Sequence, residues 1–261
     1  MLKRISIFAY GTVAYVFFLA TFLYAIGFIG NLGVPKSIDS PADNTPLGLA
    51  VLINAGLLTV FALQHSIMAR AWFKEKWTRI VPMEMERSTF VLATCAALGL
   101  LYWQWRPLGG EIWNIQDQNA RMAILGLYGF GFALVLVSTC LIDHFDLFGM
   151  RQVWLALQGK PYTHHRFQIK SLYRYVRHPL YLGFVIAFWA APTMTAARLF
   201  FALITTAYIV TAIQFEESDL VRQHGNPYAR YRSMVPMLIP RLLGKTDSGG
   251  VQKLIHESQY D

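Results

Sequence analysis

Long stretches without Asp, Glu, Lys or Arg constrain the fold more than any other feature, and the first four along the chain are each 18 residues or longer. They cover Ile5–Pro35, Asn44–Ala69, Ser88–Trp105 and Met122–Ile142. A helix of about 20 mainly apolar residues crosses the hydrocarbon core of a bilayer, and inside that core a helix satisfies its own backbone. Each stretch therefore predicts one membrane-spanning helix.

A fifth apolar region, residues 178–215, is too long for one span. Pro192 cannot continue a helical hydrogen-bond ladder, so we expect two helices, near 180–191 and 197–222, joined by a tight turn. The fold class is then an all-α transmembrane bundle of four spans plus a C-terminal helical hairpin, with five to six membrane helices. Segments 31–45 and 106–120 contain turn-forming Gly and Pro residues, and Met150–Leu157 suits a short interfacial helix.

Composition and charge agree with a membrane protein. Charged residues make up 15% of the chain, against about 25% in soluble domains. If the N-terminus is cytoplasmic, 19 of the 23 Lys and Arg residues fall in cytoplasmic segments. The positive-inside rule then places both termini in the cytoplasm and the protein in the inner (cytoplasmic) membrane. We expect residues 1–241 to form one membrane domain, residues 242–261 to form a flexible cytoplasmic tail, and no nucleic acid to be a partner.

The predicted hairpin carries two groups of polar residues at its cytoplasmic end. Pro179 suits the first turn of a helix, so that the free N–H groups beside His178 favour an anion. Glu216 and Glu217 end the second limb, and a hairpin brings them back to His178. A zwitterionic or cationic ligand suits this mixture of charges.

A third group lies at the cytoplasmic ends of the second and fourth spans. His65 is near the end of the second, and Asp143, His144 and Asp146 follow the fourth. Ionisable residues within a membrane bundle are candidates for function. The chain has no HExxH or CxxC motif, and its two cysteines lie in apolar runs, so we expect no metal site.

These residues resemble a known family of membrane methyltransferases. The C-terminal part, residues 170–236, is similar to the isoprenylcysteine carboxyl methyltransferases and phospholipid methyltransferases, through Tyr173-Arg174-Tyr175-Val176-Arg177-His178-Pro179-Leu180-Tyr181, Glu216-Glu217, Gly225, Tyr228, Tyr231 and Pro236. The upstream part resembles the NnrU-type proteins and the methanethiol S-methyltransferases among them, through Gln64-His65-Ser66 and Asp143-His144-Phe145-Asp146.

The resemblance implies methylation of a small volatile thiol, methanethiol to dimethyl sulfide, at the cytoplasmic membrane face. It implies an S-adenosylmethionine site formed by Tyr173, Val176, Arg177, His178, Tyr181, Glu216 and Glu217. The expected catalytic residues are His65 as the base, Asp146 to orient it or to take the proton, and His144 beside them. Lys170-Ser171-Leu172 replaces the Gly-Pro that the carboxyl methyltransferases usually show, which argues against a prenylated substrate.

Two alternatives remain open at this point. One is a methyltransferase that acts on a prenylcysteine carboxylate or a lipid amine. The other is a non-enzymatic accessory protein of denitrification that binds haem or a metal through His65 and His144. The paired glutamates beside Arg177-His178-Pro179 favour the enzyme, because a haem protein has no need of them.

Overall fold

The structure, a computed structural model, describes residues 1–41, 44–163 and 168–240, so the predicted tail at 242–261 lies outside the described residues. Helices make up most of these ranges, and the only strands in them are two short ones. The elements are α1 (Leu2–Gly30), α2 (Leu47–Ala69), α3 (Ala71–Trp77), α4 (Met83–Gln104), β1 (Glu111–Asn114), α5 (Gln118–Ile142), α6 (His144–Leu147), α7 (Met150–Gln158), the 3-10 helix η1 (Ser171–Arg174), α8 (Pro179–Trp189), β2 (Thr193–Thr195), α9 (Ala196–His224) and α10 (Asn226–Met234).

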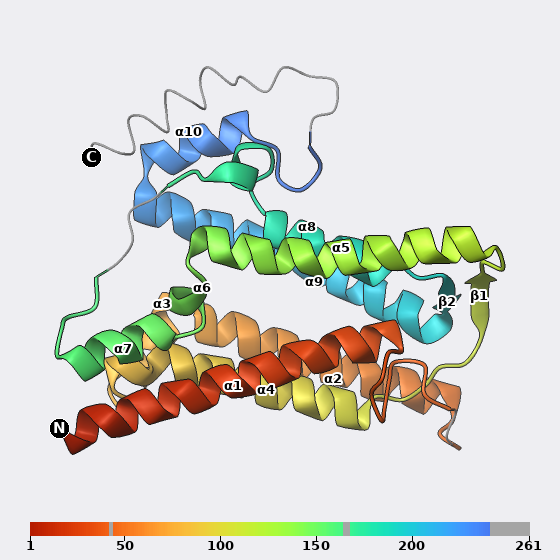
Figure 1. Ribbon diagram of the computed structural model, residues 1–261, viewed down its shortest axis with the longest axis horizontal. Coiled ribbons are helices and arrows are strands. Elements are labelled where there is room, and N and C mark those ends of the chain that lie inside the picture. The colour runs from red at the N-terminus through yellow and green to blue at the C-terminus, as the bar shows by residue number, and fades with distance from the viewer. Residues whose placement is uncertain (42–43, 164–167, 241–261) are drawn as a thin grey trace.

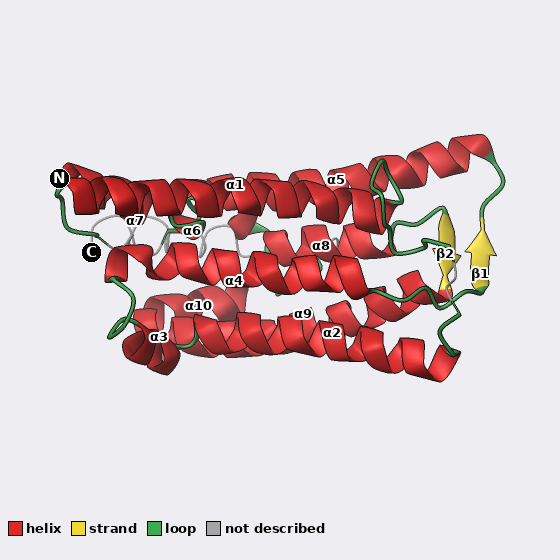
Figure 2. Ribbon diagram, turned by 90° about the horizontal axis from the view of Figure 1, so that it is seen from below, coloured by secondary structure: helices red, strands yellow, loops and turns green. Residues whose placement is uncertain are grey.

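The long helices lie side by side along the length of the molecule (Figures 1 and 2). Four of them, α1, α2, α5 and α9, are long and apolar enough to cross a membrane. The short helices α3, α6, α7 and α10 lie toward the end that holds the N-terminus, and the strands lie at the opposite end. The predicted all-α, multi-spanning membrane fold is confirmed, and the short helix expected near Met150–Leu157 is present as α7.

Two of the predicted membrane helices differ from these four. The third predicted span corresponds to α4, which packs against α1 and α2. Glu84 and Glu86 lie in its first turn, so that the apolar part is shorter than the helix. The first limb of the hairpin, α8, has 11 residues. At 1.5 Å per residue it is about 16 Å long, too short to cross a core of about 30 Å.

The end of the molecule farthest from the N-terminus contains a small sheet that the sequence did not indicate. β1 lies within the segment expected to be a turn, and it pairs antiparallel with β2 between α8 and α9. Every residue of β1 is exposed, and its sequence, Glu-Ile-Trp-Asn, does not alternate between apolar and polar residues. The sequence therefore gives no sign of a strand here. The indole of Trp113 donates to the carbonyl of Ala191 over 3.1 Å, which fastens the turn of the hairpin to the α4–α5 connection.

The same end of the molecule contains a buried arginine. Arg198, on the first turn of α9, is 6% exposed. Its guanidinium donates to the carbonyls of Thr193, over 3.1 Å, and Ile29, and it lies 3.6 Å from the carboxylate of Asp39. A buried charge is tolerated when it is paired and hydrogen-bonded. Arg198 therefore joins the C-terminal end of α1 to the start of α9, away from the opposite end of the hairpin.

Two glycines set the position of α8 against α5. A Cβ built on Gly183 would lie 2.6 Å from the carbonyl oxygen of Gly131, and a Cβ on Gly131 would lie 2.7 Å from the carbonyl oxygen of Gly183. Such close backbone contact needs residues without side chains. Since His178 and Tyr181 lie at the start of α8, this contact also fixes where their side chains point.

We expect Gly183→Ala to destabilise the protein by about 1–3 kcal/mol, the usual cost of overpacking. The matched control is Gly129→Ala, because no atom lies within 4 Å of a Cβ at Gly129 in the neighbouring helix α5. Thermal unfolding in detergent, followed by circular dichroism, measures both. Equal midpoints for the two variants would show that the α5–α8 contact does not determine stability.

Candidate active site

The two limbs of the hairpin meet through hydrogen bonds at the end toward which α10 lies. The imidazole Nε2 of His178 donates to Glu217 Oε1 over 3.0 Å. One turn along α8, the hydroxyl of Tyr181 donates to Glu216 Oε2 over 2.8 Å. This geometry agrees with the expectation that the hairpin returns both glutamates to His178.

Glu217 is the buried member of the pair, with an exposure of 3%. Its Oε1 accepts from Arg177 Nε over 2.6 Å as well as from His178, and Arg232 Nε lies 3.8 Å from Oε2. Arg177 also donates to the carbonyls of Arg232, over 2.8 Å, and Val235. Glu217 and Arg177 together therefore tie the hairpin to α10.

Glu216 has a different environment. Its carboxylate is half-buried, and the Tyr181 hydroxyl is its only hydrogen-bond partner among the described residues. No Lys, Arg or His of the described ranges forms an ion pair with it. Tyr173 is close enough that the negative charge of Glu216 adds to the effect of burial, and both raise the pKa of the Tyr173 phenol. An unneutralised carboxylate beside two neutral tyrosine rings suits a bound cation.

Val176 and the backbone of Tyr173 help to hold this arrangement in place. Val176 is 4% exposed, and its N–H donates to the carbonyl of Leu172 over 3.2 Å. The carbonyl of Tyr173 accepts from the Tyr231 hydroxyl over 2.6 Å. Val176 is therefore a packing residue, and Tyr231 holds the backbone that carries Tyr173.

His65 lies apart from this hairpin end, on α2. Its Nδ1 is 3.4 Å from Thr94 Oγ1, and its ring stacks on Phe61 with a centroid distance of 5.5 Å. Thr94 donates its own hydrogen to the carbonyl of Phe90 over 2.9 Å, so its oxygen accepts from a protonated Nδ1. The remaining nitrogen, Nε2, then carries a lone pair and makes no hydrogen bond to a described residue.

His144 differs from His65 at its second ring nitrogen. Thr139 donates its hydrogen to the carbonyl of Leu136 over 2.7 Å, and its oxygen lies 2.8 Å from His144 Nδ1. Nδ1 therefore donates, and Nε2 accepts from the Tyr15 hydroxyl at 2.8 Å. Burial lowers the pKa of His144, which keeps the ring neutral. Both ring nitrogens connect α1 to α5, and neither is free to take a proton.

The expected partnership of His65 with Asp146 does not occur in the structure. Asp146 accepts from the Tyr162 hydroxyl over 3.1 Å and from Gln152 Nε2 over 3.2 Å, and Arg151 forms an ion pair with it at 3.2 Å. Asp143 instead caps α6, since its carboxylate accepts from the N–H of Asp146. The helix α2 packs mainly against α4, with α3 and α9 also beside it, and no hydrogen bond joins Asp146 to His65.

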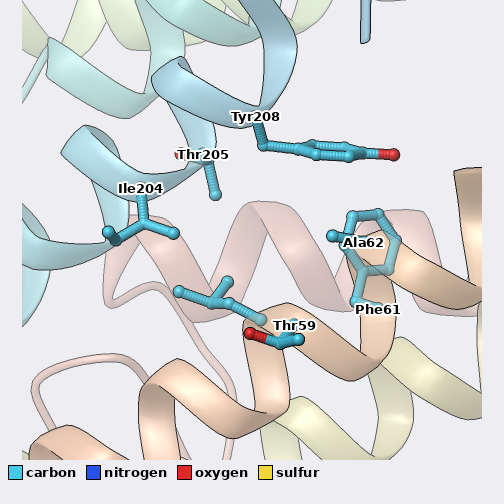
Figure 3. A pocket seen from close by; sticks show the side chains of 7 residues that line it. Thr59, Phe61, Ala62, Ile204, Thr205 and Tyr208 are labelled. Carbon is cyan, nitrogen blue, oxygen red and sulfur yellow. The ribbon is translucent and has the colours of Figure 1, made fainter. Parts of the chain in front are cut away.

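A small pocket lies between α2 and α9 (Figure 3). Phe61, whose ring stacks on His65, forms part of its wall. Its volume is about 80 Å³, and it is lined by Leu58, Thr59, Phe61, Ala62, Ile204, Thr205 and Tyr208. The Tyr208 hydroxyl is 3.1 Å from Ser66 Oγ. No motif in the sequence singles out Tyr208. It precedes Glu216 by eight residues, a spacing that places both near one face of a helix.

Metal ligands do not converge in the described part of the chain. No three side chains of His, Cys, Asp or Glu lie close enough there to hold an ion. His65 and His144, which a haem or metal protein would use, instead make the separate contacts described above.

Comparison with known proteins gives a consistent set of relatives. The chain is 52% identical to the methanethiol S-methyltransferase of Crocosphaera subtropica, over 94% of this chain and 95% of that protein. It is also 52% identical to the methanethiol S-methyltransferase of Mycobacterium tuberculosis, over 92% and 98%. A more distant relative is Nurim of Xenopus laevis, 28% identical over 71% and 68%. No protein-family model and no solved structure matches the chain.

Proposed function

Because the chain belongs to the methanethiol S-methyltransferase family, we propose that it methylates methanethiol to dimethyl sulfide with S-adenosylmethionine as the methyl donor. The observation that carries the proposal is the unneutralised carboxylate of Glu216 beside Tyr173 and Tyr181.

The residues at the hairpin end fit such a cofactor. When bound, S-adenosylmethionine supplies a methyl group on a positively charged sulfonium. Glu216 would attract the positive charge of the cofactor, and the rings of Tyr173 and Tyr181 would add cation–π stabilisation. The backbone N–H groups at the start of α8 favour its carboxylate. Glu217 is already paired with Arg177 and accepts a hydrogen bond from His178, so its role is to hold these groups in place.

His65 is the proposed base for the thiol. A thiolate is the reactive nucleophile, and a simple thiol is mostly protonated near neutral pH. Nε2 of His65 has the free lone pair that proton removal needs, because Thr94 fixes the other nitrogen as a donor. His144 lacks a free nitrogen, and Asp146 is held by Arg151, Gln152 and Tyr162.

We further propose that the cofactor site faces the cytoplasm from the inner membrane. The supporting observations are the excess of Lys and Arg in the segments assigned to that side and the position of α10 toward the same end as the N-terminus (Figure 1). A charged cofactor would reach such a site directly from the cytosol.

The proposal predicts which substrate is methylated and from which side. Inside-out vesicles that contain the protein should convert methanethiol to dimethyl sulfide when S-adenosylmethionine is added outside, whereas sealed right-side-out vesicles should not. Gas chromatography of the headspace, together with a labelled methyl group, measures the product. Labelling of a prenylcysteine or a lipid amine instead of thiols would favour the alternative enzyme, and a Soret band in the purified protein would favour a haem protein.

The two glutamates should respond differently to substitution. Glu216→Gln should weaken the binding of S-adenosylhomocysteine or S-adenosylmethionine by about 10–100-fold, since hydrogen bonds to charged groups contribute about 1.5–3 kcal/mol. Its thermal stability should stay near that of the wild type. Glu217→Gln should instead destabilise the fold by about 3–5 kcal/mol, because it leaves the largely buried guanidinium of Arg177 without its carboxylate. Calorimetric titration and thermal unfolding test this. Unchanged affinity in Glu216→Gln would remove Glu216 from the site.

The role of His65 predicts a pH-dependent defect. His65→Ala should lower the methylation rate by about 10²–10⁴-fold, the usual contribution of a general base, with cofactor affinity unchanged. Raising the pH should partly restore the rate, because more of the thiol is then already ionised. Tyr15→Phe is the control, since it removes the hydrogen bond to His144 and leaves His65 intact. A His65→Ala variant with a normal rate and a lowered melting temperature would make His65 a packing residue.

A further inference from the structure

The pocket between α2 and α9 has a size and a lining that bear on the choice of substrate. Its lining is apolar apart from the hydroxyls of Thr59, Thr205 and Tyr208. We propose that this pocket binds the thiol substrate and that its small volume favours thiols of a few heavy atoms. This inference rests on the proposed function and adds to it the site and the selectivity for the thiol.

The volume argues for a small ligand. A single water needs about 10–15 Å³ of comparable space, and the pocket has about 80 Å³. A methyl or ethyl thiol fits within such a space, whereas a prenyl chain of fifteen or more carbons would extend beyond it. The apolar lining stabilises the alkyl group through the hydrophobic effect, and the hydroxyls offer partners for a thiol hydrogen.

The pocket opens on the side of the bundle. Thr59 and Ile204, which line it from opposite helices, are both exposed, and they lie within the two membrane-spanning helices α2 and α9. Figure 3 shows the side chains of the two helices facing each other across the space. A small apolar thiol dissolves in the bilayer and would enter from there without crossing a polar surface.

Two residues of the pocket wall, Phe61 and Tyr208, relate the pocket to the two parts of the proposed site. Phe61, in its wall, stacks on His65 with a centroid distance of 5.5 Å and meets Tyr208 edge-on at 6.0 Å. Tyr208 is in turn close enough to Tyr181, the partner of Glu216, to act electrostatically on its phenol. Through Phe61 the pocket wall contacts the proposed base, and through Tyr208 it approaches the proposed cofactor site.

Two variants that change the pocket volume in opposite directions test the proposal. Ala62→Leu fills the pocket and should raise the KM for methanethiol at least tenfold. Ile204→Ala enlarges it and should shift the ratio of kcat/KM toward propanethiol by about tenfold, within the range expected for a methylene group in an apolar pocket. Ala207→Leu and Leu203→Ala are matched controls, because both residues are exposed on α9 and neither lines the pocket.

Headspace gas chromatography with methanethiol, ethanethiol and propanethiol gives the selectivity, and calorimetry with S-adenosylhomocysteine shows whether the cofactor site is intact. Cofactor affinity should be unchanged in all four variants. Selectivity in Ile204→Ala that equals that of the wild type would overturn the inference alone, even if Ala62→Leu fails to fold. A wild-type protein that binds the cofactor but methylates no thiol would refute the proposed function, and this inference with it.

Discussion

The burial of the Glu217 carboxylate is the constraint on which the proposed cofactor end depends. A carboxylate that is 3% exposed needs a paired charge and hydrogen bonds. Arg177 supplies the charge over 2.6 Å, and His178 donates a hydrogen bond over 3.0 Å. Arg177 also donates a hydrogen bond to the carbonyl of Arg232 in α10. One buried charge therefore joins the start of α8, the end of α9 and the helix that follows. The adjacent Glu216 is held in the same place but lacks a cation, so it stays available for a ligand.

The position of these groups also depends on contacts far from them. Arg198 joins the N-terminal turn of α9 to α1 at the opposite end, and the close contact of Gly131 with Gly183 presses α8 against α5. Because α8 has 11 residues, a shift at the glycine contact would move His178 and Tyr181 by a similar distance. The geometry of the hairpin end thus depends on helix packing as well as on its own hydrogen bonds.

The two histidines show how neighbouring hydroxyls decide chemistry. His65 and His144 each donate from Nδ1 to a threonine whose hydrogen is already used by a backbone carbonyl. What distinguishes them is Tyr15, which donates to Nε2 of His144 and has no counterpart at His65 in the described ranges. The structure thus separates one histidine with a free nitrogen from one that connects two helices.

The sequence by itself determined the membrane fold and the pairing of the hairpin ends. Long charge-free runs have few solutions in lipid, since each must form a helix, and Pro192 required a turn that returns Glu216 and Glu217 to His178. The sequence did not determine the roles within each pair, because adjacent residues such as Glu216 and Glu217 differ only in what packs against them. Tertiary structure also decided that Asp146 meets Arg151 and not His65, and that α2 and α9 leave a pocket beside Tyr208. These features depend on which helices become neighbours, and hydropathy carries no information about that choice.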